Sequence, residues 1–264
     1  MSDFYIPTKL LSTNNAKTIK GEKRGWTTYI MYLAPAAQND FGVNLCSHSS
    51  AGCRAACLFH SGNARFNHVQ LGKINKANYR IKAEEQFMLQ LYDEIKTIVR
   101  LHGAMTSSEQ YGRTGKLIRQ KQFAIRLNGS ADILFERIPV IDGKNLFELF
   151  PEVQFYDYTK VYRRFYKELP NNYHLTFSLH EDNAWEAFKL LKKGYNVAMV
   201  FGIKKTEAFP ITYKGYRVID GDNDDLRFLD DDNVIIGLRY KNVVSKGNSG
   251  VNKHKFDSGF VIKI

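Results

Sequence analysis

The chain has 264 residues, of which 44% are hydrophobic and 25% are charged, so it can build a packed core and is not a disordered segment. Its formal net charge of +11 leaves room for a polyanionic partner such as a nucleic acid. No apolar run approaches the roughly 20 residues that a membrane-spanning helix needs. The first residues also lack the pattern of a secretory signal, so we expect a cytosolic protein without a membrane segment.

The first part of the chain predicts an extension, a strand, a cysteine segment and a long helix. Residues 1–25 are polar and irregular, and we interpret them as an N-terminal extension. Residues 26–33 are β-branched and aromatic, which favours a strand that ends before Pro35. A cysteine segment follows at 42–60. Apolar residues then recur at steps of three and four over 73–101, which predicts one amphipathic helix.

Farther along, short apolar strands alternate with helical segments. The expected strands are 122–127, 153–158, 173–178, 196–201, 217–219 and 234–238. The expected helices are 146–150, 160–169 and a helix that starts near Asn183 and ends before Gly194. This alternation is typical of βαβ units around a parallel sheet. We therefore expect an α/β fold, a complete or partial (β/α) TIM-like barrel in a single domain over 26–264, with an open doubly wound sheet as the alternative.

Charge is unevenly spread along the chain. Seven aspartates lie between residues 219 and 233, and we interpret them as an acidic loop on an otherwise basic surface. Basic and aromatic residues alternate over 160–167, a pattern that suits phosphates and stacked bases. The same pattern also fits the solvated face of a helix, so nucleic acid is a candidate partner from charge alone.

All three cysteines lie within twelve residues, as Cys46, Cys53 and Cys57. An odd number cannot pair completely as disulfides, and clustered cysteines in a cytosolic protein more often bind metal or act catalytically. Cys53 and Cys57 are four residues apart, so a helix would place them on one face. Cys46 would approach from the preceding loop, and Gly52 permits a tight backbone there.

Three converging thiolates form a soft-ligand site, and we expect them to bind a [4Fe-4S] cluster. Because such a cluster usually has four cysteine ligands, three would leave one iron open to a small molecule. Two alternatives remain. One is a zinc site of three cysteines and one histidine, closed by His48 or His60. The other is a set of buried or redox-active free thiols.

Polar residues follow several predicted strands, at the end of a parallel sheet where sites are built. Asn128 and Asp132 follow one strand, Asp157 ends another, and His180 follows a third. We expect these four residues to line a cofactor or substrate pocket beside the cysteines. The alternative for each is a local role in a turn or a helix cap.

Two family resemblances extend these expectations. A loop with three cysteines after the first strand of a barrel resembles the radical S-adenosylmethionine superfamily, in which the open iron binds the amino acid end of that cofactor. The spacing here, Cys-x6-Cys-x3-Cys, is longer than the Cys-x3-Cys-x2-Cys of that superfamily. Across most of its length the chain also resembles a phage-encoded family called gene product eighty-eight. The stretches that carry this second resemblance are 45–57, 127–132, 155–160, 177–183 and 218–222.

The second resemblance implies a viral origin and a location in the cytoplasm of an infected bacterium. Three functions then compete. The first is a redox or radical enzyme that uses the open iron and S-adenosylmethionine or another small ligand. The second is a non-catalytic electron-transfer or cluster-binding protein, and the third is a zinc-stabilised nucleic-acid-binding protein. The sequence leaves the substrate, the fourth cluster ligand and the oligomeric state open.

Overall fold

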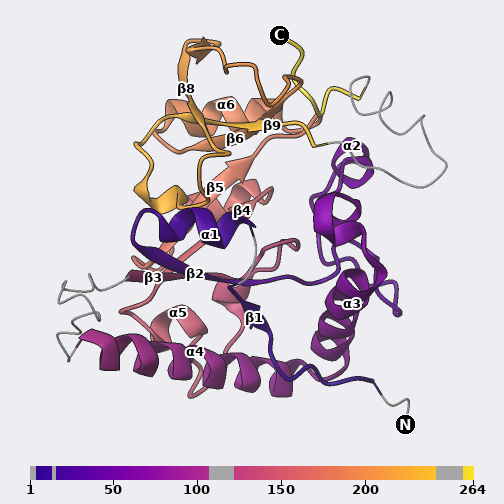
Figure 1. The fold of residues 1–264 in the computed structure, drawn as a ribbon, viewed down its shortest axis with the longest axis vertical. Coiled ribbons are helices and arrows are strands. Elements are labelled where there is room, and N and C mark those ends of the chain that lie inside the picture. Colours follow the sequence, from indigo (N-terminus) through magenta and orange to yellow (C-terminus); the bar gives the residue numbers. More distant parts are fainter. Residues whose placement is uncertain (1–3, 14–15, 107–121, 242–257) are drawn as a thin grey trace, which may run out of the picture.

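The computed structural model describes residues 4–13, 16–106, 122–241 and 258–264. Within them, nine strands form one sheet in the order β1-β2-β3-β4-β5-β6-β9-β8-β7 (Figure 1). The strands are β1 (Leu11–Ser12), β2 (Trp26–Met31), β3 (Gln122–Arg126), β4 (Gln154–Thr159), β5 (Tyr173–Ser178), β6 (Val197–Phe201), β7 (Thr212–Tyr213), β8 (Tyr216–Asp220) and β9 (Ile235–Arg239). Neighbours from β2 to β8 pair in parallel, whereas β1 and β7 pair antiparallel at the two edges.

Helices of varied length connect the strands. They are α1 (Ala16–Glu22), α2 (Ala51–Ala55), α3 (Asn67–Lys82), α4 (Glu84–Thr106), α5 (Leu146–Leu149) and α6 (Ala184–Lys192). Shorter 3-10 turns are η1 (Leu58–His60), η2 (Gly62–Arg65), η3 (Phe135–Arg137), η4 (Tyr162–Tyr166) and η5 (Arg227–Leu229). Among the described residues, no helix combines the length and the apolar character that crossing a bilayer requires.

The expected α/β class is confirmed. Strands β2 to β6 lie in the sheet in chain order, as they do in a barrel wall, whereas a doubly wound sheet reverses its order near the middle. The sheet does not close on itself within the described residues, because β1 and β7 form its two edges. The barrel therefore remains a prediction.

Alternation along the strands gives the sheet two different faces. Large apolar side chains on one face, among them Phe155, Phe177 and Met199, are buried in the main hydrophobic core. The opposite face carries Arg126 and Tyr156 together with a small apolar cluster around Ile236. The polar loops begin at the carboxyl ends of β3, β4 and β5.

Two expected helices differ from the structure. The helix expected over 73–101 is two helices, α3 and α4, which separate at Ala83 and run in different directions (Figure 1). Arg80 and Lys82 close α3, and Glu84 opens α4, so each charge favours the end of the helix dipole where it lies. The helix expected over 160–169 is the 3-10 turn η4.

Two loop interpretations change as well. Part of the expected acidic surface loop is buried, since Asp224 and Asp225 are only 9% and 2% exposed. Within the expected N-terminal extension, β1 pairs with β2 and α1 packs beside the sheet. The extension therefore contributes structure to the domain that begins at residue 26.

Candidate functional site

The cysteine segment lies beyond the carboxyl end of β2, as the sequence predicts, and all three cysteines are half-buried. Cys46 lies in the loop and its Sγ is 3.7 Å from the carbonyl oxygen of Ser130, which follows β3. Next to it, the Leu45 carbonyl accepts a hydrogen bond from the Asp132 N–H at 2.9 Å. The loops after β2 and β3 are therefore joined at Cys46.

The short helix α2 carries Cys53 and is capped in part by a residue that is distant in the sequence. The N-cap residue is Ser50, whose Oγ accepts a hydrogen bond from the Cys53 N–H at 3.0 Å. The Glu181 carboxylate, after β5, accepts from the Ser50 hydroxyl at 2.7 Å and from the Gly52 N–H at 2.6 Å. A Cβ at Gly52 would lie 2.7 Å from that carboxylate, so glycine is needed for this contact.

The expectation that one helix carries both later cysteines is wrong. Helix α2 ends at Ala55, and Cys57 is the N-cap residue of the separate turn η1. The reason is local: α2 has only five residues, and the backbone turns away after Ala56. Even so, Cys53 and Cys57 both act on the pKa of Cys46, and Cys53 acts on that of Cys57, so the three side chains lie within electrostatic range of one another.

Burial raises the pKa of two of the three thiols, those of Cys46 and Cys57. It raises the pKa of Cys46 to about 11, and the neighbouring Cys57 and Cys53 act in the same direction. Burial also raises the pKa of Cys57, while Lys73 and Lys160 oppose that rise. The segment thus combines soft ligands with two cations that favour their anionic form.

Lys160 interacts with two members of this cysteine group, Cys53 and Cys46. Burial alone would lower its pKa, but Cys53, Asp132 and Cys46 more than offset that effect, and the net pKa is raised. Its ammonium group also donates to the Ser178 hydroxyl at 3.1 Å. In the sequence Lys160 follows a predicted strand and opens the basic and aromatic stretch 160–167, whereas Lys73, on α3, carries no signal that sets it apart from other lysines.

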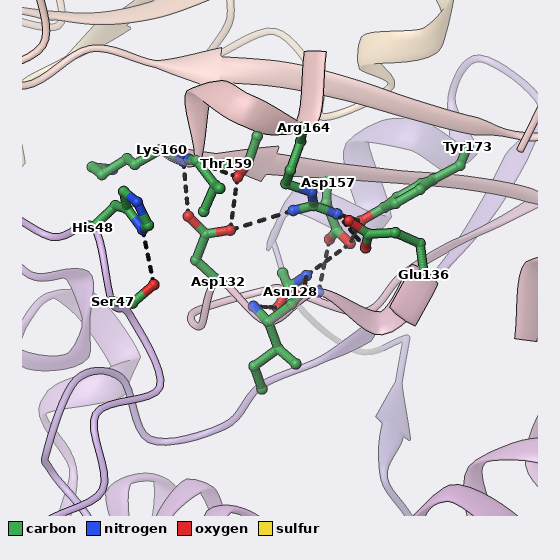
Figure 2. Close-up of polar contacts among 12 residues, drawn as sticks. Ser47, His48, Asn128, Asp132, Glu136, Asp157, Thr159, Lys160, Arg164 and Tyr173 are labelled. Atoms are coloured by element: carbon green, nitrogen blue, oxygen red, sulfur yellow. Dashed lines mark hydrogen bonds and ion pairs between the residues drawn. The ribbon is translucent and has the colours of Figure 1, made fainter. Parts of the chain in front are cut away.

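Asp132 holds the loop after β3 to the loop after β4. Its carboxylate accepts from the Thr159 hydroxyl and the Lys160 N–H, each at 2.8 Å, and lies 3.4 Å from the Arg164 guanidinium (Figure 2). Arg164 in turn pairs with Glu136 at 2.8 Å. Asp132 therefore sets the position of the backbone that carries Lys160.

Asn128 and Asp157 are buried and engaged with each other. The Asp157 carboxylate accepts from the Asn128 N–H at 2.7 Å, the Asn128 amide at 3.1 Å and the Tyr173 hydroxyl at 2.7 Å (Figure 2). Burial raises the pKa of Asp157 to about 6, although Arg126 and Tyr173 act to lower it. These contacts suit a pair of residues that holds the loop after β3 in place and so fixes the shape of a site.

The histidines occupy different settings. His180 is buried, accepts the Asp182 N–H on Nδ1 at 3.2 Å, and has a pKa lowered first by burial and then by Lys160. His48 is exposed and contacts Ser47 at 2.9 Å, while the His60 ring lies 3.5 Å from the Gln70 amide. Within the described residues, no three histidine, cysteine or carboxylate side chains are already grouped around a point that a metal ion would occupy.

The structure therefore brings the loops after β2, β3, β4 and β5 to one end of the sheet. At that end Lys73 and Lys160 act on the thiols, and the neutral His180 and the Asp132 carboxylate follow neighbouring strands. A family model described as "Gene product 88" matches residues 8–263 of the chain. No curated protein and no solved structure matches it significantly.

Proposed function

The chain belongs to the gene product 88 family, and we propose that it is an iron–sulfur protein with a [4Fe-4S] cluster on Cys46, Cys53 and Cys57. The proposal is carried by one observation. The only three cysteines of the chain lie near one another beyond the carboxyl ends of parallel strands, where Lys73 and Lys160 influence them. The family match is consistent with the expected bacteriophage origin.

The donor set fits a cluster better than a single zinc ion. A zinc ion needs every thiolate at about 2.3 Å from one point. In a cluster each cysteine binds a different iron, so the sulfurs are spread over a larger volume. Separate anchors on a loop, on α2 and on η1 suit that wider arrangement.

The nearby charges also suit a cluster. A cluster with three thiolates is anionic, and its stability and potential depend on neighbouring charge and hydrogen bonds. Lys160 keeps a raised pKa and stays charged beside Cys53, and Lys73 lies near Cys57. Both ammonium groups would offset the negative charge that the cluster brings into a half-buried site.

Three cysteines leave one iron for a further ligand, and we propose a small molecule there. S-adenosylmethionine is the first candidate, because the cysteine loop resembles that of the enzymes which use it. A cluster at this position supplies one-electron transfer. The residues of the chain would then act around it. Asp132 would fix the Lys160 backbone, and the Asn128–Asp157 pair would hold the loop after β3 in place. His180 would offer a neutral imidazole.

The proposal is tested by isolating the protein without oxygen and measuring iron and sulfide. We expect about four of each per chain in a brown protein. Cys53→Ala should lose most of the iron, whereas Ser47→Ala, a neighbouring exposed change, should retain it. A colourless protein with one zinc per chain, or full iron content in Cys53→Ala, would overturn the assignment.

A second measurement separates an enzyme from an electron carrier. The reduced protein is mixed with S-adenosylmethionine and its electron spin resonance spectrum is recorded. A changed spectrum supports a ligand-accessible iron. An unchanged spectrum, in a protein that holds its full iron and sulfide, would support the non-catalytic cluster-binding alternative.

A further inference from the structure

A cleft lies between α6 and the β7–β8 hairpin, away from the cysteines. It has a volume of about 530 Å³. The residues that line it are Ala184, Trp185, Phe188, Lys189, Lys192, Lys214 and Tyr216. The hairpin turn is made by Lys214 and Gly215, both with positive φ, as in a tight two-residue hairpin. That turn brings Lys214 over the helix, so its ammonium lies 4.9 Å from the Phe188 ring centre.

The cleft presents aromatic rings to solvent. Trp185 is 67% exposed, although tryptophan is among the side chains that gain most from burial. The Phe188 and Tyr216 rings pack 6.3 Å apart and form the floor of the cleft. Along the same surface, Tyr162 lies 6.1 Å from Trp185, and Tyr166 is 47% exposed. Such a row of accessible rings is a surface suited to stacking with a planar ligand.

Lysines alternate with these rings. The Lys189 ammonium lies 4.3 Å from the Trp185 ring centre, and that of Lys193 lies 3.8 Å from Tyr166. Lys192 and Lys214 complete the basic side chains, and the described residues that line the cleft include no carboxylate. The surface is therefore cationic and aromatic at once, which is the composition that binds a phosphate backbone and its bases together.

We propose that this cleft binds single-stranded nucleic acid, with bases stacked on Trp185 and phosphates held by Lys189, Lys192 and Lys214. A duplex fits less well, because its bases are already stacked and cannot reach the rings. An anionic membrane fits less well, because the rings here are interleaved with three lysines and do not form the continuous apolar face that inserts among lipids. The proposal is independent of the cluster and stands without it.

Binding is measured by fluorescence anisotropy of a labelled single-stranded 20-mer across a salt series, with the full chain. We expect Trp185→Ala to weaken binding about fivefold or more, the loss of one stacked base. Lys189→Gln/Lys214→Gln should weaken binding and reduce the slope of log affinity against log salt by about 1.4, or about 0.7 per phosphate contact. These side chains are exposed, so the fold should persist in both variants.

The matched control is Lys96→Gln/Lys144→Gln, which removes the same charge from exposed positions on α4 and before α5. It should leave the affinity within about twofold, since those lysines lie outside the cleft. An equal loss in this control would show that binding follows net charge alone and would overturn the proposal. Equal or tighter binding to a blunt duplex, or binding only to phosphatidylserine vesicles, would overturn it as well.

Tryptophan fluorescence gives a direct reading of stacking. The chain has two tryptophans, and Trp26 is half-buried against Phe228, at 4.7 Å between ring centres. In Trp26→Phe the remaining emission comes from Trp185. We expect an unlabelled oligonucleotide to quench that emission with the same affinity that anisotropy gives. Unchanged emission at saturation would remove Trp185 from the contact.

Discussion

At the scale of single residues, the polar side chains beyond the strands are held by partners from distant parts of the chain. Asn128, Asp132, Asp157 and His180 were found because they follow strands, and the structure places them at one end of the sheet. Their contacts come from loops that are distant in sequence, as when the Asp157 carboxylate meets Tyr173. Position along a strand is a local property, whereas a hydrogen-bond partner depends on how strands are ordered, and one sequence does not reveal that order.

The carboxylate of Asp157 should be a main source of local stability. Asp157→Ala leaves the Asn128 backbone N–H and the Tyr173 hydroxyl without their acceptor inside the protein. We expect the free energy of unfolding in urea to fall by about 3 kcal/mol. The exposed Asp93→Ala should change it by no more than about 0.5 kcal/mol. A loss at Asp157 as small as that at Asp93 would refute a structural role for the pair.

His174 should make the fold sensitive to mild acid. Burial lowers its pKa from 6.5 to about 4, and its Nε2 is buried without a hydrogen-bond partner among the described residues. As the pH falls from 6.5 towards 4, the unfolded chain takes up the proton first, so stability is lost in that window. Between pH 7 and pH 5 we expect this histidine to cost about 2 kcal/mol of unfolding free energy.

The check is urea unfolding at both pH values. His174→Gln should lose clearly less stability on acidification than the unaltered protein, because it has no proton to take up. The exposed His68→Gln should behave like the unaltered protein. If His174→Gln shows the same acid loss, the histidine is not the group that titrates.

At the scale of elements, the long regular segments were predictable and the short capped ones were not. The strand expected over 173–178 matches β5, because apolar residues alternate there against a buried face. Helix α2 has five residues and no apolar period, and it depends on a cap from Glu181, which is 129 residues away from Gly52. Nothing local in the sequence indicates such a cap, so the placement of Cys53 could not be derived.

That cap gives an element-scale prediction. Glu181→Gln replaces the carboxylate that accepts from both Ser50 and Gly52 with a weaker, uncharged acceptor. Helix α2 should fray, so Cys53 in the metal-free protein should react faster with a thiol reagent. We expect a several-fold increase, since a cap of this kind is worth about 1 kcal/mol.

Glu152→Gln is the control, because Glu152 is exposed and far from α2 in sequence. Its thiol reactivity should match that of the unaltered protein. Burial acts to raise the pKa of Glu181, but the hydrogen bonds that its carboxylate accepts outweigh burial, so the net pKa is lowered. The cap is therefore fully present above pH 4.5 and weakens below it. Acid should then also increase the rate at which Cys53 reacts, after that rate is corrected for the fraction of the reacting thiol that is ionised at each pH.

At the scale of the whole molecule, the sequence predicted the class of the fold but not the polar face of its sheet. Arg126 and Asp225 are 99 residues apart, yet their buried charges meet at 2.7 Å. Tyr158 joins them through a 3.3 Å hydrogen bond. Seven aspartates in a short stretch suggest a solvated loop from composition alone, because two of the arginines that pair with them, Arg24 and Arg126, lie far away in the chain.

This buried pair fastens the late chain to the centre of the sheet. Asp225→Ala leaves the Arg126 charge buried, and we expect about 3 to 5 kcal/mol of lost unfolding free energy. Arg126→Met/Asp225→Leu removes both charges, so its loss should be clearly smaller than the sum of the losses in Arg126→Met and Asp225→Leu measured singly. Additive losses in urea unfolding would contradict direct coupling. The exposed pair of Arg217 and Asp231 supplies the control, since Asp231→Ala should cost under about 1 kcal/mol.

The far end of the chain has a practical consequence for the metal analysis. Ile262 forms a parallel bridge with Phe201, and Gly259 lies close to Glu181, so the C-terminal residues run beside the segment that caps α2. Figure 1 shows the described segment that precedes β1 on the opposite side of the molecule from the C-terminal end. A polyhistidine purification tag joined after Ile264 would bring extra imidazoles near the thiols and compete for iron or zinc. The same tag joined at the other end of the chain should avoid this competition, because the segment before β1 lies on the opposite side of the molecule.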